Sequence, residues 1–435
     1  MGDRKGAQAL RDRARAAPLG RRDLVVDLAR VACILLVVVG HLLMVGVGVD
    51  PSGAIVLSRP IDAQAWFIAA TWAGQVMPLF FALGGFTAVV SLRRRRAHGG
   101  SAIDFVRART LRLATPALPL FACVAIALGV AALAGVDPVL LGAIAAGIGV
   151  PLWFLATYLF VQCLVPLLSE LHRRAPSRTL VALAVAVVIV DAARIGSGIP
   201  EVGMLNVAFV AAFVQQIGFW YADGWFRRRT RLQLLVIAVA AYVLIWPGVA
   251  VGWHSPNMLT NLEPPTSPLM LLGIAQMCIF SLLHPPLSLL MSSRVLRAGV
   301  YFVASRAVTL YLWHLPIIVA VSAVALLWPG ASPEPESPEW WFSRPVVLVI
   351  VLATVWLVSL PIARFESFVA AVPAGFRRPS SAAVVTAAVL AFLPAFAEIV
   401  WSLDLALAVA GTAMLTASLA LDRARRNPTN PPQTT

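Results

Sequence analysis

The sequence carries little charge for its length. Only 12% of its 435 residues are charged, against roughly 25% in an ordinary soluble domain. Hydrophobic residues make up 60% of the chain, and the mean hydropathy is +0.85. A soluble fold of this length would leave much of that apolar surface in contact with water. The composition therefore disfavours soluble, fibrous and disordered proteins alike.

Lysine and cysteine are also scarce. Lys5 is the only lysine among 34 basic residues, and this bias, together with the abundant alanine, is typical of a GC-rich bacterial genome. The basic residues lie in short groups between apolar runs, so the net charge of +14 does not predict nucleic-acid binding. The four cysteines lie inside apolar runs without metal-ligand spacing: Cys33, Cys123, Cys163 and Cys278. We expect buried small apolar side chains, no metal site and no permanently bound cofactor.

Long apolar runs dominate what is present. A membrane-spanning helix needs about 20 apolar residues, and twelve runs approach or exceed that length. They are Leu24–Val47, Trp66–Leu92, Leu113–Leu133, Ala145–Leu168, Leu180–Ile199, Val202–Phe226, Leu232–Gly252, Leu269–Leu290, Val300–Trp328, Val346–Ile362, Ala382–Val400 and Leu403–Leu421. The pattern predicts an all-α polytopic membrane protein with about twelve transmembrane helices, the last two joined by a tight hairpin.

The distribution of basic residues predicts the orientation in the membrane. Placing the basic tail 1–22 in the cytosol and alternating the spans puts every Lys and Arg except Arg59, Arg194 and Arg344 at the cytosolic side. This follows the positive-inside rule. We therefore expect both termini, including the tail 422–435, to be cytosolic, and the protein to reside in the bacterial plasma membrane.

The first span contains polar residues that are expensive to bury in lipid. Arg30 and His41 lie eleven residues apart in RDLVVDLARVACILLVVVGHLLMV. This spacing is three helical turns plus about 20°, so both project from one face, about 16 Å apart along the axis. Arg30 alone is consistent with snorkelling or with pairing to Asp27, and His41 alone with an interhelical hydrogen bond. An imidazole at this depth is also a candidate general base.

The second span and the loop after it add two features. In QVMPLFFALGGFTAVV, Pro78 and the pair Gly84-Gly85 favour either a kink that opens a cavity beside His41 or close helix packing. In FVRARTLRL, Arg109 and Arg112 share a helix face at the predicted cytosolic mouth. They are candidates for binding phosphates or lipid headgroups.

These pieces, in this order, resemble the acyltransferase 3 family of integral membrane O-acyltransferases. The matching elements are Arg30-x10-His41, Pro78–Phe86, Arg109-x-x-Arg112, Pro151–Phe154, Tyr311–Pro316 and Arg364-x-Glu366. The resemblance implies a ten-helix acyltransferase core over residues 23–368, with two additional helices in 369–421. Gly84 stands where the family usually has serine.

The resemblance implies transfer of a short acyl group, acetyl-like, from acyl-CoA to a hydroxyl of a cell-envelope glycan, glycolipid or similar acceptor. A sugar hydroxyl is a poor nucleophile, so a positioned base is required. We expect His41 to take the acceptor proton or to mediate an acyl relay. Arg30 is expected to contact the donor phosphates or to balance the charge of the pocket, and Arg109 and Arg112 to bind the donor phosphates. Four further residues are expected along the substrate path: Trp153, Trp313, His314 and Glu366.

The alternative is a secondary transporter or exporter of a glycolipid or small molecule. Twelve spans with both ends inside suit that class. Against it, the two halves show no similarity, and the acidic residues Asp27, Asp191, Glu398 and Asp404 all lie near the ends of predicted spans. The sequence alone leaves both interpretations open, the acyltransferase and the transporter, and it favours the acyltransferase.

Overall fold

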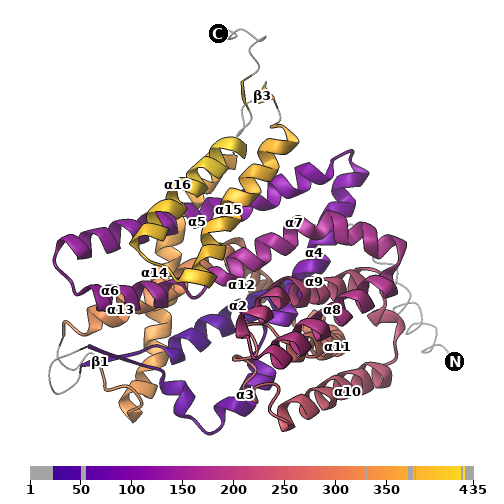
Figure 1. Ribbon diagram of the computed structural model, residues 1–435, viewed down its shortest axis with the longest axis horizontal. Helices are drawn as coiled ribbons and strands as arrows, with labels where there is room; N and C mark the ends of the chain where they lie inside the picture. The colour runs from indigo at the N-terminus through magenta and orange to yellow at the C-terminus, as the bar shows by residue number, and fades with distance from the viewer. Residues whose placement is uncertain are drawn as a thin grey trace. The chain divides into compact units, whose positions relative to one another are not determined.

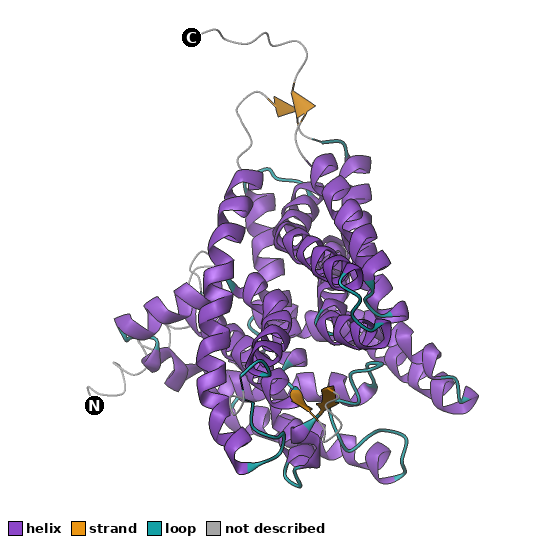
Figure 2. Ribbon diagram, turned by 90° about the vertical axis from the view of Figure 1, so that its left-hand side faces the viewer, coloured by secondary structure: helices purple, strands orange, loops and turns teal. Residues whose placement is uncertain are grey.

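Helices make up almost all of the described chain, and the strands form two short antiparallel pairs (Figure 2). The computed structural model describes residues 23–49, 55–328, 332–370, 376–377, 379–422 and 425–426. Within these ranges, twelve helical stretches are long and apolar enough to cross a membrane. The predicted all-α polytopic fold is therefore confirmed. The predicted tail 1–22 and most of the predicted tail 422–435 lie outside the described residues.

The chain divides into two compact units, and three helices run from one into the other: α2 (Leu24–Met44), α4 (Met77–Ala97) and α7 (Leu152–Arg174). The first unit contains residues 1–33, 75–94 and 165–305. Its other elements are α8 (Pro176–Ser197), η2 (Pro200–Met204), α9 (Leu205–Ala222), η3 (Phe226–Arg228), α10 (Arg231–Ala250), α11 (Ser267–Leu290) and α12 (Arg294–Ser305). The best-buried helix of this unit is α9, whose apolar side chains pack on all sides.

Close backbone contact joins α4 to α9 in this first unit. A Cβ atom at Gly85 would clash with the carbonyl oxygen of Gln215, and one at Gly218 would clash with the carbonyl oxygen of Ala82. Pro78 lies in the first turn of α4, where a missing N–H leaves no hydrogen bond unmade. Gly85 therefore allows close packing of α4 against α9, which is one of the two predictions for this segment. Pro78 produces no kink in the middle of the helix.

A fully bonded histidine ties α7 to α9 in the same unit. His172 is only 3% exposed, and its Nδ1 lies 2.9 Å from Oε1 of Gln216 while its Nε2 lies 3.0 Å from Oδ2 of Asp223. The Gln216 amide donates to the carbonyl of Leu168, which turns its oxygen toward the ring. Oδ1 of Asp223 accepts a hydrogen bond from Arg93 at 2.7 Å. Both ring nitrogens of His172 therefore face acceptors.

The second unit contains residues 34–74, 95–164 and 306–435. Its elements are β1 (Gly46–Val49), β2 (Ile55–Ser58), η1 (Pro60–Ala63), α3 (Phe67–Gly74), α5 (Ala102–Leu133), α6 (Pro138–Gly149), α13 (Ala307–Ala325), α14 (Pro338–Ala370), β3 (Phe376–Arg377), α15 (Ser381–Trp401), α16 (Leu405–Asp422) and β4 (Arg425–Arg426). The 32 residues of α5 reach about 48 Å. This exceeds the roughly 30 Å hydrocarbon core of a bilayer, so its arginine-bearing first turns extend beyond the apolar stretch.

The two C-terminal helices pack into this unit as closely as any others. In Figure 1, α15 and α16 run side by side against α5. The sequence predicts a tight hairpin between them, and the structure places this connection at residues 402–404. Gly411 lies where a Cβ would clash with the ring of Phe121, so α16 approaches α5 closely. Gly149 of α6 likewise makes room for Leu403, whose Cβ would lie 2.8 Å from a Cβ at that glycine.

Several predicted boundaries of the spans are wrong. The first helix ends at Met44 rather than Val47, and β1 then pairs with β2. The second run splits into α3 and α4 around Gln75, whose backbone oxygen accepts a hydrogen bond from Gln276 at 2.6 Å. The fourth run splits into α6 and α7 before Leu152.

The ninth and tenth runs also differ from the prediction. The ninth transmembrane helix begins at Ala307 rather than Val300, because the helix breaks at Arg306 and the preceding residues form the separate α12. The tenth, α14, continues past Ile362 to Ala370. Arg364 and Glu366 therefore lie in the last two turns of α14.

Candidate active site

The helix that carries the predicted base is regular. α2 is unbroken from Leu24 to Met44, because its apolar run contains no proline. The expectation that Arg30 and His41 share a face therefore holds along this helix. At Gly40, immediately before the histidine, an added Cβ would meet no atom within 4 Å. His41 is half-buried.

His41 meets a second histidine from α13. Its Nδ1 lies 2.8 Å from Nε2 of His314, and the two rings stack with centroids 5.0 Å apart. His314 is fully buried. Both imidazoles lie in predicted membrane spans, and His314 was predicted to lie along the substrate path. The structure instead places it against the predicted base.

The hydrogen bonds around this pair assign a role to each ring nitrogen. Nδ1 of His314 lies 2.6 Å from the carbonyl oxygen of Tyr311, which only accepts, so Nδ1 carries the proton. In a neutral ring Nε2 of His314 is then the acceptor, and Nδ1 of His41 donates to it. The lone pair of His41 is left on Nε2, which makes no hydrogen bond with any described residue.

Tyr311 is itself anchored, which fixes the carbonyl that orients His314. Its hydroxyl donates to the carbonyl oxygen of Pro151 at 3.1 Å, at the turn between α6 and α7. Its ring packs on Phe154 with centroids 4.5 Å apart. The break in the fourth predicted span therefore leaves the carbonyl oxygen of Pro151 available to accept a hydrogen bond from the buried hydroxyl of Tyr311.

The two predicted tryptophans lie beside these residues. Trp153 is half-buried and packs edge-on against Phe154 at 6.0 Å. Trp313 precedes His314 on α13, and its indole N–H is buried without a hydrogen-bond partner among the described residues. A buried donor left unpaired costs about 1–3 kcal/mol. This N–H is therefore a candidate donor to a bound substrate.

A carboxylate from the C-terminal helices also reaches this region. Glu398 of α15 is 9% exposed, and its Oε1 would lie 3.0 Å from a Cβ atom at Gly149. It interacts electrostatically with Tyr311. In the sequence, Glu398 lies near the end of a predicted span and has no predicted role. Its local sequence contains no signal for a contact with Tyr311, 87 positions earlier.

Arg30 does not pair with Asp27 in the described chain. Its guanidinium lies over the ring of Phe80, 5.2 Å from the centroid, and its Nε is buried without a hydrogen-bond partner among the described residues. A cation held on an aromatic face retains hydrogen-bonding capacity at the edge of its plane. That capacity is what the predicted role beside the donor requires.

The arginines of FVRARTLRL point to different neighbours. The guanidinium of Arg109 lies 5.0 Å from the ring centroid of Phe105. Arg112 interacts electrostatically with Glu366 of α14, as does Arg306. The structure therefore brings together two residues, Arg112 and Glu366, that the sequence predicted separately. Among the described residues, no three His, Cys, Asp or Glu side chains gather as a metal ion requires.

Comparison with known families identifies the reaction class. A family model described as an acyltransferase domain, Acyl_transf_3, matches residues 23–364. The chain belongs to the acyltransferase 3 family. It is therefore a membrane acyltransferase, which favours the enzyme over the exporter that the sequence left open. Comparisons with curated proteins and with solved structures gave no significant match.

The acyltransferase 3 match includes the histidine pair and the arginines of α5, and it ends before Glu366. The helices α15 and α16 lie wholly outside it. The carboxylate of Glu398 is thus supplied by a part of the chain that the family model does not cover.

Proposed function

We propose that this acyltransferase moves a short, acetyl-like acyl group from acyl-CoA to a hydroxyl of a cell-envelope glycan, glycolipid or similar acceptor, with His41 as the general base. The observation that carries the proposal is that Nε2 of His41 makes no hydrogen bond with a described residue, on a ring whose Nδ1 is bonded to His314 at 2.8 Å. A base needs one nitrogen available and the other one held.

In the proposed step, Nε2 of His41 takes the proton of the acceptor hydroxyl as its oxygen attacks the thioester carbonyl carbon. The new C–O bond forms, the C–S bond breaks, and the proton passes from Nε2 to the departing sulfur. The products are the ester and free CoA, and His41 returns to its starting state. Charge develops on the imidazole in this step, and the chain from its Nδ1 through His314 to the carbonyl of Tyr311 stabilises that charge.

Recognition of the donor is proposed for the arginines. Arg109 and Arg112 lie in the turns of α5 that extend beyond its apolar stretch, and Glu366 holds Arg112 through a charge interaction. Guanidinium groups bind phosphates through paired N–H donors, and CoA is rich in phosphates. Arg30 contributes a further cation to the donor or balances charge beside it. Trp153 and Trp313 line the substrate path, where the unpaired indole N–H of Trp313 meets a substrate oxygen.

The proposed setting is the bacterial plasma membrane with both termini in the cytosol. Arginines concentrate at that side under the predicted topology. Acyl-CoA is a cytosolic polyanion, so the donor meets the basic mouth from the compartment in which it is made.

The test uses the full chain reconstituted in lipid nanodiscs, with acetyl-CoA and an extract of lipid-linked envelope glycans. We expect release of free CoA thiol and an acyl mass increment on the acceptor. His41→Ala should lower the rate by about 10²-fold or more, because a general base contributes 10²–10⁴-fold.

The matched control is His284→Ala, which removes a histidine that is 3.2 Å from Asp23 and outside the proposed site. It should keep the wild-type rate once equal amounts of folded protein are compared. Thiol release by His41→Ala at the wild-type rate would refute the base assignment. An unmodified acceptor that accumulates inside cells, with no acyl increment in any strain, would favour export instead.

A further inference from the structure

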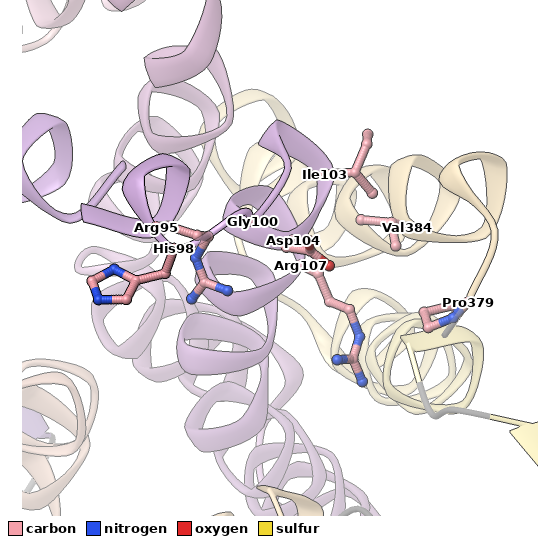
Figure 3. Close-up of a pocket in the computed structure, with 8 residues that line it drawn as sticks. All are labelled: Arg95, His98, Gly100, Ile103, Asp104, Arg107, Pro379 and Val384. Atoms are coloured by element: carbon pink, nitrogen blue, oxygen red, sulfur yellow. The ribbon is translucent and has the colours of Figure 1, made fainter. Parts of the chain in front are cut away.

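A second basic site lies between the start of α5 and the C-terminal helices, within the second unit. Figure 3 shows a pocket lined by Arg95 and His98 before α5, by Ile103 and Arg107 on α5, and by Pro379 and Val384 at α15. Its volume is about 360 Å³. This is at the lower end of the range for small-molecule sites, about 300–1,000 Å³, and suits one phosphorylated group rather than a whole coenzyme.

The first cation of this pocket is Arg95. The guanidinium of Arg95 makes no hydrogen bond or ion pair with a described residue, and its Nε is buried. Gly100 lies directly against this side chain, since a Cβ there would clash with Cγ of Arg95. Gly100 thus packs against an arginine side chain that makes no hydrogen bond with a described residue, an arrangement that a bound anion would stabilise.

The second cation is oriented by α16. Nε and Nη2 of Arg107 both donate to the backbone carbonyl of Asp422, at 3.1 and 2.7 Å. The remaining Nη1 makes no hydrogen bond with a described residue. In Figure 3 the side chains of Arg95, on α4, and Arg107, on α5, extend in the same general direction. The fork of Arg107 is thus held in place with one nitrogen left for a ligand.

The acidic residue that lines the pocket, Asp104, is hydrogen-bonded within the N-terminal cap of α5. Oδ2 of Asp104 accepts hydrogen bonds from the backbone N–H and the hydroxyl of Ser101, at 3.0 and 2.9 Å, in the capping box of α5. The opposite wall is apolar, formed by Ile103, Pro379 and Val384. The pocket therefore offers a basic side to an anion and an apolar side to whatever the anion is attached to.

We propose that this pocket binds the phosphate ester of an organic anion, with the guanidinium groups of Arg95 and Arg107 on the phosphate and the attached group against Ile103 and Val384. A phospholipid headgroup and the phosphate of a soluble nucleotide coenzyme share this chemistry. The site is distinct from the proposed donor site, because Arg107 and Arg109 lie about 200° apart around α5. Its apolar wall also comes from α15, outside the family match.

The experiment measures binding without turnover, so its result does not depend on the proposed acyl transfer. The full chain is placed in nanodiscs of neutral phosphatidylcholine, and two probes are titrated: phosphatidylglycerol, incorporated at increasing fractions, and adenosine 3′,5′-bisphosphate in solution. Binding is followed by native mass spectrometry for the lipid and by calorimetry for the nucleotide. The variants are Arg95→Gln with Arg107→Gln, and Gly100→Ala, which should displace the Arg95 side chain.

Arg96→Gln is the matched control, since it removes one charge from an exposed position in the same arginine run that does not line the pocket. We expect saturable binding of one probe, weakened about tenfold or more by the double variant, by severalfold in Gly100→Ala, and by less than twofold in Arg96→Gln. Binding of the lipid identifies a headgroup site, and binding of the nucleotide identifies a coenzyme site. The proposal is overturned if neither probe saturates, or if Arg96→Gln weakens binding as much as the double variant does.

Discussion

Hydrogen bonds orient a histidine in each of the two units, and the two histidines are held differently. In the first unit, His172 faces acceptors with both nitrogens, Gln216 on one side and Asp223 on the other. In the second unit, His41 commits only Nδ1, to His314, and its Nε2 meets no described residue. All of these contacts have ordinary hydrogen-bond lengths, so the distances alone do not distinguish a structural histidine from a catalytic one.

The difference lies in what remains after the contacts are made. A ring bonded on both sides ties α7 to α9 and has nothing to offer a substrate, so we interpret His172 as structural. A ring bonded on one side is oriented but still basic. An imidazole inside the fold is therefore a candidate base when a partner holds one ring nitrogen and no described residue bonds to the other.

The largest effect that would break this comparison concerns His314. His314→Ala should lower kcat by about 10²-fold, because His41 then loses the acceptor that keeps its proton on Nδ1. His314→Gln should recover part of the rate, since an amide oxygen accepts from the same N–H, and KM should change little in either variant. Steady-state kinetics in nanodiscs over a range of pH measure this. A rate loss without a change in the pH profile, and without recovery by glutamine, would make His314 merely structural.

An intermediate effect is expected at His172. His172→Ala leaves Oε1 of Gln216 without its donor and removes one of the two groups bonded to Asp223, so it should destabilise the fold by about 1–3 kcal/mol. The folded fraction should keep the wild-type kcat. Thermal unfolding in detergent and activity below the melting temperature provide the two measurements. Lost activity in a fully folded variant would show that this histidine takes part in the reaction, and the comparison would fail.

The smallest effect is a pH dependence of stability from Asp223. The hydrogen bond from His172 lowers the pKa of this carboxyl below its ordinary value of 3.8, burial opposes the shift, and Arg93 adds to it. Because the folded pKa is below the unfolded one, the stabilisation is complete above the unfolded pKa and is lost as pH falls through the folded value. Asp223→Asn should therefore flatten the fall in melting temperature below about pH 4. An unchanged slope would mean that other carboxyls dominate.

Much of the fold follows from the sequence because the signals are local. Twelve apolar runs appear as twelve candidate spans, and the short link between α15 and α16 is visible in the spacing of their apolar runs. The boundaries were less predictable. Gln75 inside the second run ends a helix because its backbone oxygen bonds to Gln276, about 200 positions away. Periodicity within a run contains no information about such a partner.

The candidate site shows the same division. The shared face of Arg30 and His41 follows from their spacing on one helix. The contact between His41 and His314 spans 273 positions, and nothing in either segment announces it. The helical period places Arg107 and Arg109 on different faces of α5. Only the structure shows that α16 packs on the face of Arg107, where the carbonyl of Asp422 accepts its hydrogen bonds.

The sequence by itself determined that this is a polytopic helical protein of the acyltransferase 3 type, since hydropathy and motif spacing are properties of consecutive residues. The tertiary structure alone decided which imidazole nitrogen is bonded within the described chain, which arginines line the second pocket and how the C-terminal helices complete the second unit. The physical reason is that hydrogen bonds and ion pairs act over a few ångströms. They depend on which distant segments meet, and the order of residues along the chain does not state that.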